Sequence, residues 1–250
     1  MIKFSAATHK GMIRETNQDY YVAGESPVSL FVLCDGMGGH KGGDIASKTA
    51  AESINKYISA HYSFDNDDEK AAKLLKSAIE YANKMVYMRA RKMLDCSDMG
   101  TTCEVCYVDF DTLYIGHVGD SKVYLYRENE LSQLTDDHTL VAELLKNGTI
   151  TEKEVAGHPA RHVITRAVGT EEGIKSDFIK VPLLDNDIIL MCSDGLTDML
   201  TESAVKKILL PGCGLQQMAD KFIEKANENG GLDNITVVVL QYTKNEEVMA

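Results

Sequence analysis

The sequence lacks an excess of positive charge. Its 26 lysine and arginine residues stand against 38 aspartate and glutamate residues, which gives a formal net charge of −12 at pH 7. No basic face is therefore available to neutralise the phosphates of a nucleic acid or of an anionic membrane surface. The composition excludes these two classes of partner, and bound cations would offset part of the acidity.

The sequence also lacks a long apolar run. No window approaches the roughly 18 apolar residues of a membrane-spanning helix, and residues 1–12 contain His9 and Lys10 but no apolar stretch. We therefore expect neither a signal peptide nor a membrane anchor, and we expect a cytoplasmic protein.

Cysteines are few and scattered, which fits a reducing compartment. Cys103 and Cys106 have the spacing of half a zinc site, but residues i and i+3 of a strand point to opposite faces. We therefore expect the six cysteines to be free thiols, without a zinc site or a disulfide framework.

Nothing divides the sequence into separate parts. It contains no Pro/Ser-rich linker and no internal repeat, and its 250 residues, 44% of them hydrophobic, can bury either one large core or two small ones. We therefore interpret residues 1–250 as a single domain.

What the sequence does contain is a series of turns that place an acidic residue at the end of an apolar strand. The first follows a strand expected at residues 30–34, where the chain turns through DGMGG from Asp35 before Asp44 opens a helix. Glycines let a backbone approach a small group closely, so that a main-chain carbonyl and the Asp35 side chain can face one point. That geometry suits a hard cation or a phosphate, and an ordinary tight turn is the structural alternative.

Two nucleotide-binding motifs do not fit this loop. The spacing of its glycines differs by one residue from that of the dinucleotide fingerprint. That fingerprint also requires an acidic residue at the end of a second strand ~20 residues later. That position falls near Lys56 and Tyr57, inside the helical pattern. A P-loop is excluded because no Gly-Lys-Ser/Thr follows the glycines.

Three further acidic residues lie in turns at strand ends: Asp120 after residues 113–118, Asp194 after residues 187–192 and Asp233 before residues 235–242. One such turn is an ordinary hairpin signal. Together with Asp35, four such acids predict a site at which carboxylates converge. Oxygen ligands without clustered histidine or cysteine favour Mg²⁺ or Mn²⁺ over zinc or copper.

Arg14 precedes a cluster of polar residues that leads into a strand. Asn17, Gln18 and Asp19 follow it, and the strand is expected at residues 19–23. The Arg14 guanidinium could therefore reach the same end of the sheet as Asp35. An arginine in a surface loop is the alternative.

The apolar periodicity predicts both helices and strands. Helical spacing covers residues 44–60, 70–93, 202–209 and 215–227, and strand-like runs cover residues 3–7, 19–23, 30–34, 100–109, 113–118, 122–126, 177–181, 187–192 and 235–242. We expect the runs between residues 100 and 126 to form an antiparallel meander. Helices come in pairs between antiparallel runs, which excludes a doubly wound sheet and favours an α+β fold with stacked antiparallel sheets and helices outside.

Residues 136–169 show a looser pattern than the segments around them. They contain a short helix at residues 140–146, a break at Gly148 and a turn at Pro159. We interpret this segment as an insert that crosses over the site, and we call it the flap.

Eight motifs follow one another along the chain: RETNQD from Arg14, VLCDGMGGHKGG from Val32, GTT from Gly100, HVGDSKVYLYR from His117, LTDDHT from Leu134, GHPARHVITRAVG from Gly157, CSDGLTDML from Cys192 and DNITVVV from Asp233. In this order they resemble the motifs of the metal-dependent protein phosphatases of type 2C, the PPM family, and of its bacterial branch above all. The resemblance covers residues 3–242.

The resemblance implies a central β-sandwich of two antiparallel sheets flanked by pairs of helices, in αββα layers, with a two-metal centre at one edge. Asp35 would bridge two Mn²⁺ or Mg²⁺ ions, the Gly36 carbonyl would hold one of them, and Asp194 and Asp233 would hold the other. A third ion would bind to Asp120 together with Asp194.

The resemblance also implies the activity. The chain would be a protein serine/threonine phosphatase that hydrolyses phosphoserine and phosphothreonine by in-line attack of a metal-bridging water, with Asp35 and Asp194 as the catalytic ligands. Two cations ~3.5–4 Å apart would screen the charge of the phosphate and lower the pKa of that water. Arg14 matches the arginine that receives the substrate phosphate, which a guanidinium can grip with two hydrogen bonds. Asp19 matches an acid that acts on the ions through water.

The implied partners are phosphoproteins, with a cognate serine/threonine kinase and its substrates among them, and the implied state is a monomer. Two other functions compete with this interpretation. A pseudophosphatase would bind phosphoproteins without turnover, and the intact set of acidic ligands speaks against it. A phosphatase for small phosphoesters would use the same residues.

One position departs from the pattern of the eukaryotic members. These have a histidine two residues after the bridging aspartate, as a candidate general acid, and here Met37 takes that place. His40 follows three residues later. The general acid is therefore either His40 or a metal-bound water, and a loop-packing histidine is the structural alternative for His40.

Overall fold

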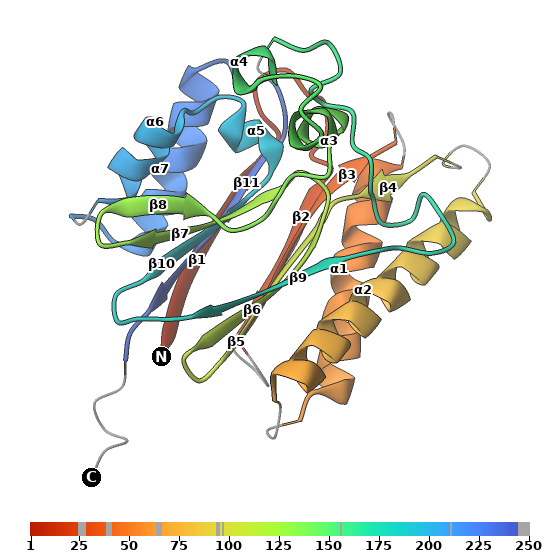
Figure 1. Ribbon diagram of the computed structural model, residues 1–250, viewed down its shortest axis with the longest axis horizontal. Coiled ribbons are helices and arrows are strands. Elements are labelled where there is room, and N and C mark those ends of the chain that lie inside the picture. Colours follow the sequence, from red (N-terminus) through yellow and green to blue (C-terminus); the bar gives the residue numbers. More distant parts are fainter. Residues whose placement is uncertain are drawn as a thin grey trace.

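Two antiparallel sheets, stacked face to face, form the centre of the molecule (Figure 1). The computed structural model describes residues 1–24, 29–38, 42–63, 67–93, 96, 98–155, 157–210 and 212–244. In the first sheet the strands follow the order β1 (Ile2–His9), β11 (Ile235–Tyr242), β10 (Ile188–Cys192), β7 (Lys122–Arg127) and β8 (Glu130–Gln133). In the second sheet the order is β2 (Asp19–Gly24), β3 (Ser29–Met37), β5 (Cys103–Asp109), β6 (Thr112–Val118) and β9 (Asp177–Pro182), and the short β4 (Gly100–Thr101) pairs with the end of β3.

Strand β3 is buried on both faces, which explains its unbroken apolar sequence. Phe31 and Leu33 point into the layer between the two sheets. Val32 and Cys34 point the other way, toward the helices that cover the second sheet. The strand that leads to Asp35 is therefore fixed by packing from both sides.

The cysteines behave as the sequence predicts. Cys103 packs toward the helices and Cys106 toward the other sheet, because β5 is a regular strand. All six cysteines are free thiols. The spacing of these two residues therefore makes no zinc site.

Helices cover the outer face of each sheet (Figure 1). The helices α1 (Gly43–His61) and α2 (Asp68–Ala90) pack on the second sheet, and α5 (Asp194–Thr197), α6 (Glu202–Leu209) and α7 (Leu215–Glu228) pack on the first. The layers are therefore αββα, and the predicted α+β fold is confirmed. None of the helices in the described ranges combines the length and the apolar character needed to cross a bilayer.

The flap leaves the first sheet after β8 and carries two short helices, α3 (Leu140–Lys146) and α4 (Glu152–Val155). Both lie at one end of the molecule, and the start of β1 lies at the other end (Figure 1). The flap returns through an isolated bridge between Val168 and Thr101, which places its last residues beside β4. Both ends of the flap are thereby attached to the sheets.

The acidic run before α2 caps that helix. The Asp67 carboxylate accepts a hydrogen bond from the Lys70 N–H at 2.8 Å, and Asp68 lies in the first turn. Carboxylates at a helix N-terminus accept hydrogen bonds from free N–H groups and interact favourably with the helix dipole. Their role is thus structural.

Two predicted details of the fold are wrong, and two elements were not predicted. The runs between residues 100 and 126 are not one meander: β5 pairs with β6, but β7 lies in the other sheet, between β10 and β8. Strand β3 continues through Met37, where a turn was expected, and pairs there with β4. Neither β8 nor α5 was predicted. Periodicity reports which face of a strand is buried, but it does not report which strand is its partner.

Candidate functional site

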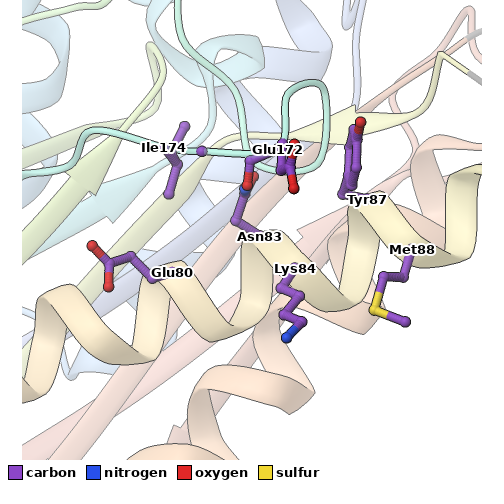
Figure 2. A pocket seen from close by; sticks show the side chains of 8 residues that line it. Glu80, Asn83, Lys84, Tyr87, Met88, Glu172 and Ile174 are labelled. Atoms are coloured by element: carbon purple, nitrogen blue, oxygen red, sulfur yellow. The ribbon is translucent and has the colours of Figure 1, made fainter.

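A cavity of about 870 Å³ opens where the ends of the strands meet. It is lined by every residue predicted for the site except Asp19: Arg14, Asp35, Gly36, Asp120, Asp194 and Asp233. Met37 also lines it, and His40 falls outside the described residues. A second cavity of about 560 Å³ lies between α2 and residues 172–174, and none of the predicted site residues lines it (Figure 2).

Asp35 is held by the backbone and by two threonines. Its N–H donates to Thr102 Oγ1 at 2.9 Å, and its carbonyl accepts from the Thr102 N–H at 2.9 Å and from Thr101 Oγ1 at 2.8 Å. On its other side it stands opposite Asp19 in the β2–β3 pair. The GTT motif therefore fixes the position of Asp35, a role that the sequence alone did not reveal.

Gly36 lies where only a glycine fits. A Cβ atom at this position would stand 2.0 Å from the Gly43 carbonyl oxygen and 2.6 Å from the Gln18 carbonyl oxygen. Glycine is favoured where the backbone needs a positive φ or where two backbone segments approach closely. Here the second reason applies, because the start of α1 lies against the end of β3.

Asp194 opens α5 directly after β10. Its Oδ1 is buried and has no hydrogen-bond partner, and the same is true of Oδ1 of Asp19. The other oxygen of Asp19, Oδ2, accepts a hydrogen bond from Ser193 Oγ at 2.8 Å, so Asp19 lies directly behind Asp194. Two buried carboxylate oxygens thus point to a missing positive partner.

Asp233 is anchored through its neighbour Asn234. The Asn234 side chain accepts from the Gln18 N–H at 2.8 Å and donates to the carbonyls of Lys10 and Thr16 at 3.0 and 2.9 Å. One asparagine therefore ties the loop of residues 10–18 to the start of β11, beside Asp233. Oδ1 of Asp233 itself accepts a hydrogen bond from the Asn234 N–H at 2.7 Å.

Arg14 forms an ion pair with Asp233 across the cavity rim. Its Nη2 lies 2.6 Å from Asp233 Oδ2, and the two side chains are 51% and 34% exposed. Arg14 and Asp35 lie at the same end of the sheet, as expected, since both line the same cavity. The guanidinium is accessible, and its contact with Asp233 is an exposed one that a stronger anion can replace.

The carboxylates of the cavity repel one another in a buried setting. Burial, followed by repulsion from Asp19 and Asp194, raises the pKa of Asp35 well above its ordinary range. Burial and the charge of Asp194 raise the pKa of Asp120 to about 7, and burial raises that of Asp19 to about 7. Burial and the charge of Asp233 raise the pKa of Asp194 as well.

These residues fit divalent cations. Their donor atoms are oxygens, they converge from four different strand ends, and two of the oxygens have no hydrogen-bond partner. A cluster of buried carboxylates costs several kcal/mol unless a positive charge balances it. Hard cations such as Mg²⁺ and Mn²⁺ select such oxygen ligands.

The flap adds residues that the sequence did not assign to the site. Arg161, His162 and Ile164 line the cavity, together with Asp198 beyond the end of α5. His162, Asp194 and Asp198 each place one side-chain ligand atom within 4.8 Å of the others. Only the interpretation of residues 136–169 as a segment over the site hinted at them.

The comparisons with known proteins agree with this geometry. The family model of Protein phosphatase 2C matches residues 10–233. Serine/threonine phosphatase stp of Listeria welshimeri is 37% identical over 236 residues, which cover 94% of this chain and 93% of the relative. The structure of the S. agalactiae serine/threonine phosphatase superposes with a TM-score of 0.90 at 33% identity and covers 98% of this chain and 100% of that chain.

A third relative was solved with metal ions. The catalytic domain of the serine threonine protein phosphatase PstP, in complex with 2 manganese ions, has a TM-score of 0.83 at 31% identity and covers 97% of this chain and 99% of that chain. The family match spans most of the chain, and relatives above 30% identity align over nearly all of it. This chain therefore belongs to the protein phosphatase 2C family of metal-dependent protein phosphatases.

Proposed function

We propose that this chain hydrolyses the phosphate monoesters of phosphoserine and phosphothreonine in phosphoproteins. The observation that carries the proposal is the convergence of the buried Asp120 and the half-buried Asp35 and Asp194 on one cavity with Arg14 at its rim. A phosphate dianion needs both cations and a guanidinium, and this cavity offers sites for both. The relatives are named as serine/threonine phosphatases, which supports the choice of substrate.

We assign two core ions, Mn²⁺ or Mg²⁺, to this cluster. Asp35 would bridge them, the Gly36 carbonyl would hold one, and Asp194 and Asp233 the other. A third ion would bind Asp120 and Asp194. Bound ions of this kind supply positive charge for the phosphate oxygens and lower the pKa of a coordinated water. The PstP domain with 2 manganese ions supports Mn²⁺.

The residues of the chain would contribute binding and orientation. Arg14 would leave Asp233 and take two oxygens of the phosphate, because a dianion attracts a guanidinium more strongly than one shared carboxylate does. Thr101 and Thr102 keep the Asp35 backbone in place. Ser193 orients Asp19, which would act on the ions through water.

The setting of the enzyme is also part of the proposal. We assign a cytoplasmic location, a monomeric state and a single domain over residues 1–250, with the flap at about residues 136–169. The partners would be phosphoproteins that a cognate serine/threonine kinase produces. Free cysteines support a reducing compartment.

A single comparison of substrates tests the proposal. Release of phosphate is measured from a phosphothreonine peptide, a phosphotyrosine peptide and a sugar phosphate, with and without Mn²⁺. We expect Mn²⁺-dependent turnover of the phosphothreonine peptide above the other two. Binding of that peptide without turnover would replace the proposal by a pseudophosphatase, and faster turnover of the sugar phosphate would replace it by a phosphatase of small phosphoesters.

A further inference from the structure

His138 lies outside the carboxylate cluster but bonds to the turn that carries Asp120. Its N–H donates to the Gly119 carbonyl at 2.7 Å, and the Gly119 N–H donates back to His138 Nδ1 at 3.1 Å. Gly119 has a φ of +114°, and a Cβ atom there would stand 2.6 Å from Thr102 Cγ2. The turn is thus pressed between Thr102 on one side and His138 on the other.

The same histidine bonds to residues 161–166 of the flap, which we call the returning arm. The Thr165 N–H donates to the His138 carbonyl at 2.8 Å, and Arg166 Nη1 lies 2.9 Å from His138 Nε2. Next to them, Thr139 and Ile164 form an isolated bridge. Ile164 lines the catalytic cavity, so this arm reaches the place where a substrate would bind.

The imidazole has one defined arrangement of hydrogen bonds. It is 5% exposed, and burial together with His117 and Arg166 lowers its pKa to about 4, so the ring is neutral near pH 7. Because Nδ1 accepts from Gly119, the ring hydrogen is on Nε2, which donates to Asp177 Oδ2 at 3.3 Å. Arg166 Nη1 is also a donor, so its approach to Nε2 is not a hydrogen bond, and the ring is linked to Arg166 through Asp177. Asp177 also binds Arg166, at 3.0 Å.

A second buried histidine supports the ring from behind. The rings of His117 and His138 lie against each other with centroids 4.4 Å apart and planes tilted by 36°. His117 is fully buried, with Nδ1 2.6 Å from Glu104 Oε1 and Nε2 2.8 Å from the Asp136 carbonyl oxygen. His138 therefore has little freedom to rotate away when the flap moves, and a shift of the arm is passed on to Gly119.

We propose that His138, near the start of the flap, is a positioning residue that couples the returning arm of the flap to Asp120, so that the position of this arm and the binding of a cation at Asp120 depend on each other. The proposal rests on the assignment of a cation to Asp120 under the proposed function. Coupling of this kind is reciprocal: whatever fills the Asp120 site orders the arm, and whatever orders the arm strengthens that site.

Two variants separate the two contacts of the ring. In His138→Asn the side-chain oxygen takes about the position of Nδ1, since both atoms are bonded to Cγ, and it retains the acceptor for Gly119. The donor at Nε2, which links the ring through Asp177 to Arg166, is lost. His138→Leu loses both contacts. The control is Ile189→Val, which removes one methyl group from the layer between the sheets and touches neither the turn nor the flap.

The experiment measures two quantities that need no turnover. One is the affinity of each Mn²⁺ binding step, from calorimetric titration. The other is hydrogen exchange of the amides in residues 161–166 as Mn²⁺ is added. In the wild-type chain we expect exchange to slow by about 5-fold or more as the weakest Mn²⁺ step is filled. In His138→Asn the affinity of this Mn²⁺ step should stay within about 2-fold of the wild-type value, but more than half of the Mn²⁺-dependent slowing of hydrogen exchange should be lost.

His138→Leu should weaken the same step by about 10-fold and leave the tighter steps unchanged, while Ile189→Val should change neither quantity. As a kinetic check, His138→Asn should raise KM for a phosphothreonine peptide more than it lowers kcat. Exchange that does not respond to Mn²⁺ in the wild-type chain, or that responds equally in His138→Asn, overturns the coupling. Failure of the proposed function would show separately, as absent turnover of the peptide.

Discussion

Asp35 and Asp120 face the same cavity but are held in different ways. Asp35 belongs to β3, which is packed on both faces, and two threonines bind its backbone. Asp120 lies on a turn between strands of different sheets, and the residue before it is bonded to His138 and through it to the flap. One acidic residue of the cavity is therefore part of the rigid core, whereas the other is attached to a segment that lines the cavity.

Removal of all metal should have the largest effect on activity, because it affects Asp35 and Asp120 alike. We expect thorough chelation followed by gel filtration to abolish phosphatase activity, and Mn²⁺ to restore it, because the carboxylates alone repel a phosphate. The measurement is hydrolysis of p-nitrophenyl phosphate before and after Mn²⁺ is returned. Activity that survives chelation undiminished would exclude a metal-dependent reaction.

Substitution of Asp35 tests the rigid side of the comparison. Asp35→Asn keeps the shape and removes the charge, so we expect kcat to fall by about 10³-fold or more. The metal-free protein should become more stable, by about 1–2 kcal/mol, since a repelling buried carboxylate is gone. Urea denaturation in chelator measures the second effect. The control is the exposed Asp185→Asn, and a stability loss in Asp35→Asn would contradict the assigned repulsion.

Raised pKa values also predict how the metal-free protein responds to pH. Asp19 and Asp120 have pKa values of about 7 in the folded chain, against an ordinary value of about 4 in the unfolded chain. Between these values the folded chain binds more protons. The free energy of unfolding therefore falls as the pH rises, and the contribution that is complete below pH ~4 is lost as the pH passes about 7.

Denaturation at pH 5 and pH 8, with chelator or with saturating Mn²⁺, checks this sign. Without metal we expect the protein to be less stable at pH 8, by on the order of 3 kcal/mol. With Mn²⁺ the difference should largely vanish, because the cation replaces the protons. Two other buried groups titrate in this window with opposite signs: Glu104, whose pKa burial raises to about 7, adds to the difference, and His138, whose pKa burial lowers to about 4, opposes it. Equal stability at both pH values without metal would contradict the raised pKa values of Asp19 and Asp120.

The sequence was most informative where a side chain follows from its own strand. Alternation placed Cys103 and Cys106 on opposite faces, and acids at strand ends were expected to converge, as Asp35 and Asp194 do around the cavity. The sequence did not predict which distant segments become neighbours in the fold. Gly119-Asp120 looked like a hairpin turn, yet it crosses between sheets, because the choice of a neighbouring strand depends on packing of the whole chain.

The flap network shows the same limit. His138 and Arg166 lie in two of the motifs, but neither position has a periodic pattern that would reveal that both bond to Asp177. Their partners are a glycine backbone and a strand residue 39 positions from His138, Asp177. Such contacts are fixed by tertiary geometry and not by local spacing.

Arg14 provides a smaller and more specific test at the rim of the cavity. Arg14→Ala should raise KM for a phosphothreonine peptide by about 10-fold and lower kcat less, if the guanidinium binds the ground state and the transition state alike. Arg14→Lys keeps the charge but loses the paired hydrogen bonds, so it should recover only part of the affinity. An unchanged kcat/KM in Arg14→Ala would remove Arg14 from the site.

The smallest expected effect concerns the exposed surface of the flap. Lys146 and Glu152 are exposed on or beside its two short helices, and neither lines the cavity. Charges in such positions can contact residues that flank a phosphorylated side chain without disturbing the ligands. We therefore expect Lys146→Glu and Glu152→Lys to change kcat/KM among phosphopeptides of different charge by about 2- to 5-fold, in opposite directions.

Two comparisons make this last prediction decisive. Hydrolysis of p-nitrophenyl phosphate, which has no flanking residues, should stay nearly constant in both variants. Lys3→Glu makes the same charge change as Lys146→Glu on an exposed residue at the start of β1, at the end of the molecule away from α3 and α4 (Figure 1). If Lys3→Glu shifted peptide preference equally, the effect would come from net charge through the long-range field. If both substrate types lost activity in parallel, the flap would act on the ligands or on folding, and the contrast between its outer surface and its inner arm would fail.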